Sequence, residues 1–155
     1  MRRVLYILRI VVISPEFVAL AVIALLLLVQ PGIYIWFSSR INSGNEMIKW
    51  FGLLPAGMTG IMVTRNAELL SPDPQEAAKF LLQWPEYYKI EYRFWICLFF
   101  GIIGSIACGY VLLFGDLKDY IMLAIFLGGI TVSSISFLTF LSATITLKRI
   151  MSMIS

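Results

Sequence analysis

Side chains able to perform nucleophilic, acid–base or metal chemistry are few and widely spaced in this sequence. The chain has no histidine and two cysteines, Cys97 and Cys108. Eleven positions on one predicted helix separate the two thiols by about 16 Å along its axis. That distance is too long for a mutual disulfide or one shared metal ion. We expect both cysteines to act as small apolar packing residues.

Hydroxyl groups form the second candidate set, since eight serine and threonine residues fall between positions 131 and 146. A serine nucleophile needs an activating base, and the sequence shows none beside these residues, nor a glycine-rich phosphate loop or paired carboxylates in an apolar segment. We therefore predict no enzyme activity, no catalytic residues, and no cofactor or metal. The hydroxyls are expected to bond to their own helix, to a neighbouring helix, or to water in a pore.

The elements that carry these residues are long runs without charge. Residues 94–114 and 120–147 contain no charged side chain and are separated by five residues. About 20 such residues in a helix cover the hydrocarbon core of a bilayer. The overall composition, 60% hydrophobic and 14% charged, agrees with this interpretation. The two runs predict a transmembrane hairpin.

Two further segments complete the predicted all-α fold, a four-helix transmembrane bundle in a single domain. Residues 17–37 are free of charge, with a Gln30-Pro31 step that neighbouring helices are expected to accommodate. Residues 47–64 are apolar but short, and Pro55 and several glycines interrupt them, so this segment spans the bilayer or dips into it and returns. Four spans with both termini in the cytoplasm place nine basic residues inside and three outside. This topology predicts a multi-pass protein of the bacterial inner membrane.

The polar parts of the chain lie at its beginning and in one long loop. Residues 1–13 predict an amphipathic helix on the membrane surface, with Arg2, Arg3 and Arg9 in its polar sector. Residues 65–93 predict a helical cytoplasmic loop, in which Phe80, Leu81 and Trp84 form a face for docking a protein partner.

Aromatic residues gather where that loop meets the next predicted span. Small residues recur every fourth position in two of the predicted spans. Tyr88, Tyr92 and Trp95 are expected at the membrane interface. The small residues are Gly52, Ala56 and Gly60 in one span and Gly101, Ser105 and Gly109 in the next. Such ridges let helices approach closely, either within one bundle or between copies of the chain.

This layout of a basic N-terminal helix, four spans and one structured cytoplasmic loop resembles the small membrane subunit of the bacterial Kiwa anti-phage defence system. The resemblance implies an oligomeric subunit, here guessed to be a tetramer, that senses a membrane event and anchors or regulates a cytosolic protein partner. Membrane lipid is the other expected partner, and direct binding of nucleic acid is not expected. A small pore-forming or channel-like effector is the alternative function.

Overall fold

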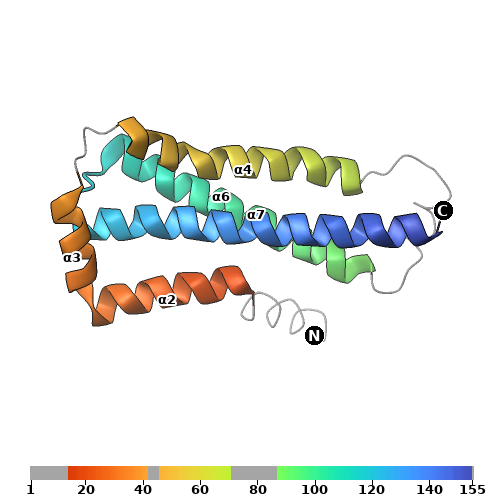
Figure 1. Ribbon diagram of the computed structural model, residues 1–155, viewed down its shortest axis with the longest axis horizontal. Helices are drawn as coiled ribbons and strands as arrows, with labels where there is room; N and C mark the ends of the chain where they lie inside the picture. Colours follow the sequence, from red (N-terminus) through yellow and green to blue (C-terminus); the bar gives the residue numbers. More distant parts are fainter. Residues whose placement is uncertain (1–13, 42–45, 71–86, 155) are drawn as a thin grey trace.

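The computed structural model describes residues 14–41, 46–70 and 87–154, and these residues form helices joined by short connections (Figure 1). The described residues therefore form the all-helical arrangement that the charge-free runs of the sequence predict. The helices are α2 (Pro15–Val29), α3 (Pro31–Arg40), α4 (Glu46–Leu70), α6 (Tyr87–Phe114) and α7 (Tyr120–Ile154). The predicted interfacial helix 1–13 lies outside the described residues.

The predicted span 17–37 is two helices, α2 and α3, which are bent by 89° relative to each other. The bend falls at Gln30, whose backbone leaves the helical region (φ −134°, ψ 61°). Pro31 is the cause, because a proline disfavours helical geometry in the residue before it and lacks an N–H for the helix ladder. The Gln30-Pro31 step therefore redirects the chain, and α3 turns across the end of the molecule (Figure 1).

The other three helices extend further than the predicted spans. Helix α4 has 25 residues, or about 37 Å, and continues through Pro55 without a break. Helix α6 runs unbroken from Tyr87 into the predicted third span, as expected from the sequence. Helix α7 has 35 residues and is about 52 Å long. Between α6 and α7, Asp119 begins the second helix by accepting a hydrogen bond from the Ile121 N–H at 3.0 Å.

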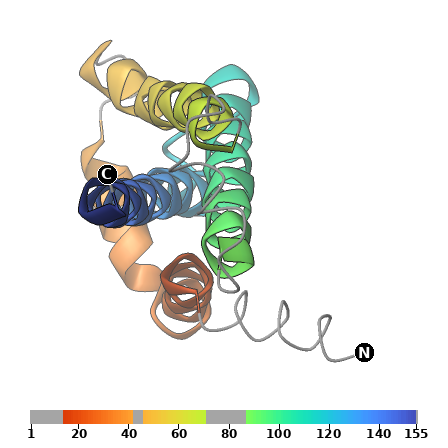
Figure 2. The same ribbon diagram turned by 90° about the vertical axis from the view of Figure 1, so that its right-hand side faces the viewer.

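Helices α4, α6 and α7 pack together as a three-helix bundle, with α2 against α7 on the opposite side from α4 (Figure 2). At the end where α6 begins, the bundle core contains Met62, Phe94 and Phe140, and the two rings lie 5.1 Å apart between centroids. A second buried cluster around Val111, Leu123 and Phe126 fills the other end. Helix α2 begins near the middle of the long axis of the molecule, whereas α7 ends at its right-hand end (Figure 1).

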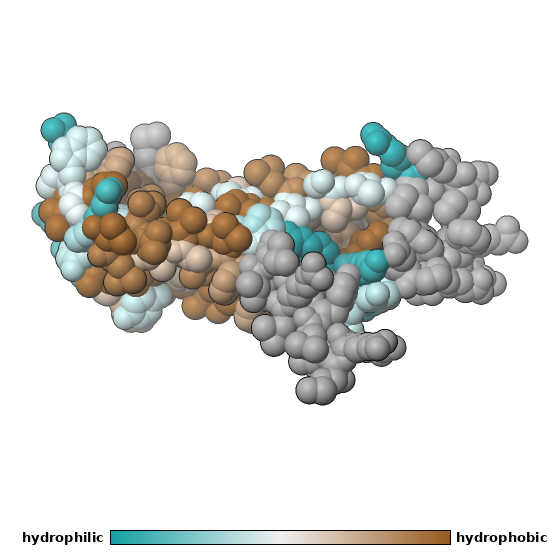
Figure 3. All heavy atoms as spheres, turned by 90° about the horizontal axis from the view of Figure 1, so that it is seen from below, coloured by the Kyte–Doolittle hydropathy of each residue, from teal (hydrophilic) through white to brown (hydrophobic). Residues whose placement is uncertain are grey.

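The outer surface of the helices is largely apolar. Leu28, Leu113 and Phe114 are each more than three-quarters exposed, and the face that carries α2 is dominated by hydrophobic residues (Figure 3). Within residues 14–41, 46–70 and 87–154, two helices are long and apolar enough to cross a membrane, at Tyr88–Phe114 and Tyr120–Arg149. The bent α2–α3 pair makes a third if it counts as one broken span. These features indicate a membrane protein. The predicted count of four spans, which requires α4 to cross as well, stays a prediction.

Candidate functional site

The most unusual polar group in the described residues is a carboxylate with no solvent exposure, Glu16 in the first turn of α2. The Nη2 group of Arg93 on α6 donates to both of its oxygens, at 2.9 and 3.0 Å. The thiol of Cys97 donates to Glu16 Oε1 at 3.7 Å. We call these three residues the Glu16 cluster. The cluster joins α2 to α6 through Glu16 and Arg93, which lie 77 positions apart in the sequence.

Local sequence positions each member of the Glu16 cluster. Ser14 accepts a hydrogen bond from the Phe17 N–H at 3.1 Å, and Pro15 occupies the first helical position, so α2 begins immediately before Glu16. A carboxylate in a first helical turn is stabilised by the helix dipole. On α6, Arg93 and Cys97 are four residues apart and therefore lie on one face of the helix.

The burial of Glu16 makes the position of α2 depend on the ion pair with Arg93. Cys97, which contacts Glu16, is buried, and one-fifth of the Arg93 side chain is exposed. A carboxylate taken out of water is costly unless it is paired and hydrogen-bonded. Glu16 meets this condition only while the first turn of α2 stays within reach of Arg93 on α6. The arrangement can hold a helix in place, and its chemistry is that of a structural ion pair.

The predicted packing ridges divide between the interior and the surface. A Cβ atom added to Gly52 would lie 2.8 Å from the Phe126 ring, and one added to Gly101 would lie 3.1 Å from Thr59 Oγ1. Ser105 shares a 2.9 Å hydrogen bond with Thr59. Gly52, Gly101 and Ser105 thus pack within the molecule.

The remaining three ridge residues show no such packing among the described residues. Ala56 and Gly60 are exposed on α4, and Gly109 is half-buried on α6. A Cβ atom added to Gly60 or Gly109 would meet nothing within 4 Å among the described residues. Of the two alternatives for these ridges, packing within the molecule therefore holds for half of the residues, and packing between copies stays a prediction for the others.

Helices α6 and α7 approach each other closely at Gly104 and Gly129. A Cβ atom on Gly104 would lie 2.6 Å from the carbonyl oxygen of Gly129, and one on Gly129 would lie 2.8 Å from the carbonyl oxygen of Gly104. Cys108 adds its thiol, which donates to the Phe126 carbonyl at 3.5 Å. Both cysteines are buried and free, in agreement with their predicted packing role.

Most of the hydroxyls on α7 bond within the protein. The hydroxyls of Thr131, Thr139, Thr144 and Thr146 each donate to the carbonyl four residues earlier. Ser133 reaches the Gly101 carbonyl on α6 at 3.4 Å. These bonds favour the packing interpretation of the hydroxyls over a water-lined pore.

The predicted interfacial aromatic residues lie near the start of α6. Tyr88 and Trp95 are about half exposed, and the rings of Tyr88 and Tyr92 make an edge contact at 6.1 Å between centroids. This placement suits an aromatic belt. The predicted docking residues Phe80, Leu81 and Trp84, and the basic residues Arg2, Arg3 and Arg9, lie outside the described residues.

Sequence reasoning did not predict the pairing of Glu16 with Arg93. A signal was present, because each charge stands at the edge of a long apolar run, where an ionisable residue is expected to find a partner. The neighbouring charges Lys89 and Glu91 made the choice of partner ambiguous.

Comparison with known proteins adds no family to these observations. The sequence matches no protein-family model, and neither the curated proteins nor the solved structures gave a match.

Proposed function

We propose that this protein is a non-enzymatic subunit of the bacterial inner membrane that senses a membrane event and passes it to a cytosolic protein partner. In this proposal the sensing element is the α2–α3 arm, residues 15–40, and the Glu16 cluster connects it to α6. The observation that carries the proposal is the complete burial of Glu16 against Arg93.

The length of α2 makes the arm sensitive to the bilayer. Its 15 residues extend about 22 Å, which is shorter than the roughly 30 Å hydrocarbon core. A helix too short for its bilayer responds to changes in thickness by moving or by thinning the lipid around it. Movement of α2 toward the interface would bring Glu16 into headgroup water and replace the ion pair by two hydrated charges. Two such arrangements can be close in free energy, because the cost of desolvation opposes the attraction of the pair.

Helix α6 provides the route to the partner. Arg93 lies less than two turns from Tyr87, where α6 begins, and the predicted docking loop directly precedes that residue. A change at Arg93 therefore acts at the end of the helix that is covalently joined to the docking face. We place this end, together with both chain termini, in the cytoplasm, which agrees with the excess of basic residues there.

The proposal also includes assembly into a homo-oligomer, with a tetramer as the working assumption. It further includes a role in anti-phage defence. Ala56 and Gly60 support assembly, since small residues on the exposed side of α4 allow a second helix to approach. The resemblance in layout to the Kiwa membrane subunit supports the role in defence.

The sensing proposal is tested by the distance between α2 and α6 in bilayers of different thickness. Spin labels at the exposed residues Val22 and Ile106 report this distance, while the buried native cysteines remain. We expect the distance to change between short-chain and long-chain phosphatidylcholine, and Glu16→Gln to give the displaced distance in both. Glu91→Gln, which removes a carboxylate from the same end of the molecule, should behave as the wild type. A wild-type distance independent of thickness would overturn the sensing role.

The partner proposal has a separate test. Replacing Phe80, Leu81 and Trp84 by serine should release a cytosolic protein that co-purifies with the wild type, without loss of membrane insertion. Unchanged co-purification would remove this docking face.

A further inference from the structure

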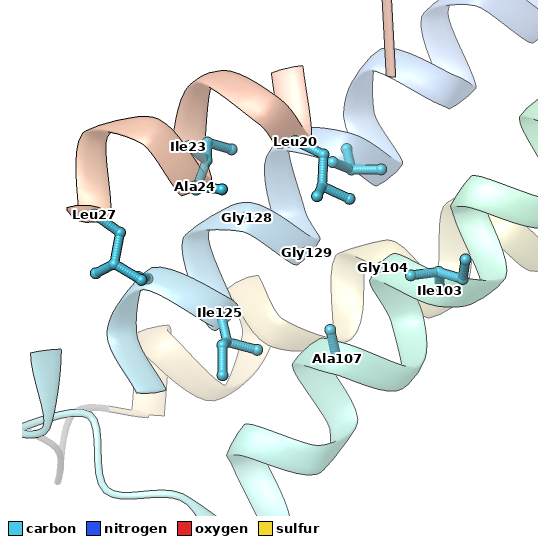
Figure 4. A pocket seen from close by; sticks show the side chains of 12 residues that line it. Leu20, Ile23, Ala24, Leu27, Ile103, Gly104, Ala107, Ile125, Gly128 and Gly129 are labelled. Atoms are coloured by element: carbon cyan, nitrogen blue, oxygen red, sulfur yellow. The ribbon is translucent and has the colours of Figure 1, made fainter. Parts of the chain in front are cut away.

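A groove runs between α2, α6 and α7, with a cavity volume of about 230 Å³. Leu20, Ala24 and Leu27 of α2 line one wall, and Ile103 and Ala107 of α6 line the other (Figure 4). Helix α2 packs on α7, where Ile23 lies 3.6 Å from a Cβ atom added to Gly128, but it stands apart from α6 across the groove.

The lining of the groove is hydrocarbon from all three helices. Every residue that lines it is aliphatic or glycine, and Gly128 and Gly129 of α7 form the strip between the two walls (Figure 4). Such a surface offers no hydrogen bond to a polar ligand, so its occupant must be apolar.

The Glu16 cluster stands beyond one end of this groove. Glu16 precedes Leu20 by four residues on the same face of α2, and Arg93 precedes Gly104 by eleven residues, or three turns, on the same face of α6. The guanidinium at this end already binds a carboxylate. A free fatty acid in the groove would need a cation for its own carboxylate. A phospholipid needs none here, because its headgroup stays at the membrane surface while its acyl chain enters the groove.

We propose that the groove binds one acyl chain of a bilayer phospholipid. Its length along α2, from Leu20 to Leu27, is about 10 Å. A helix from a second copy of the chain has a diameter of at least about 10 Å, which fits poorly into a cavity of about 230 Å³. A single hydrocarbon chain is thin enough to enter. Binding of this chain does not depend on the sensing role, because it follows from the shape and lining of the groove in the structure as it stands.

The experiment uses the full chain in vesicles that contain phosphatidylcholine with a photoreactive diazirine in the middle of one acyl chain. After illumination, mass spectrometry locates the labelled residues. We expect Ile103, Ala107 and Ile125 in the groove to be labelled more strongly than Ile106, which is 65% exposed on α6. Higher labelling at Ile106 than in the groove would overturn the proposal.

A matched pair of variants on α2 provides the control. Ala24 lines the groove, whereas Ala21 is exposed on the same helix and does not line it. Ala24→Phe should reduce groove labelling about fivefold by filling the space, and Ala21→Phe should leave it unchanged. Ala107→Phe, from the opposite wall, gives the same expected loss if Ala24→Phe fails to fold. Equal labelling in the two α2 variants would contradict lipid binding.

Discussion

The three-helix bundle of α4, α6 and α7 and the α2–α3 arm are held in different ways. The bundle has backbone contact at Gly104 and Gly129, an interhelical hydrogen bond from Thr59, and a core filled by aromatic rings. The arm has apolar contact with α7 and the ion pair of the Glu16 cluster, and an apolar groove separates it from α6.

This difference shows what fixes the position of a helix in lipid. Burying apolar surface distinguishes poorly between protein and lipid, because lipid tails are as apolar as leucine. Close backbone approach and paired polar groups remain as the forces that select one arrangement. The bundle has many such contacts, and among the described residues the arm relies strongly on Glu16. The arm should therefore be the part of the molecule that moves.

The largest expected effect comes from breaking the ion pair. Arg93→Met leaves Glu16 buried without its cation, which should cost about 3–5 kcal/mol of arm docking. Hydrogen exchange of the α2 amides should then accelerate, while exchange in α7 stays slow. The double variant Glu16→Leu with Arg93→Met should recover most of the protection, because it removes both charges. If the double variant exchanges as fast as the single one, the pair does not hold the arm.

The second effect concerns the close approach of α6 and α7 at Gly104 and Gly129. Gly104→Ala puts a methyl group against the Gly129 carbonyl and should separate α6 from α7, at a cost of about 1–3 kcal/mol. Thermal unfolding of the purified protein measures this loss. Gly57→Ala is the control, since its Cβ meets open space among the described residues and the proposed assembly does not use it, and it should not lower the melting temperature. Equal melting temperatures for the two variants would show that the crossing is not tightly packed.

The smallest effect distinguishes a bond between helices from a bond within one helix. Thr59→Val removes the hydrogen bond to Ser105 and should cost about 0.6 kcal/mol, and at most about 1.7 kcal/mol, by the same unfolding measurement. Thr64→Val is matched to it, because the Thr64 hydroxyl donates to the Gly60 carbonyl of its own helix at 2.8 Å and is exposed. That control should change stability by less than about 0.5 kcal/mol. A larger loss for Thr64→Val than for Thr59→Val would contradict the assignment.

Much of the helical structure could be predicted from the sequence because its causes are local. The charge-free runs, the Ser14-Pro15 start of α2 and the turn between α6 and α7 are properties of neighbouring residues. The packing ridges were predicted less completely. Their spacing identified small residues, but spacing alone does not say which side of a helix meets a neighbour.

The sequence by itself determined that this chain is apolar, helical and suited to a membrane, since composition and periodicity act within each segment. Only the tertiary structure decided that Gly104 and Gly129 are in contact and that Glu16 pairs with Arg93 across 77 positions. The physical reason is that these features depend on how separate helices are placed against one another. A helix fixes the direction of its own side chains, and the partner that each side chain meets is set by packing.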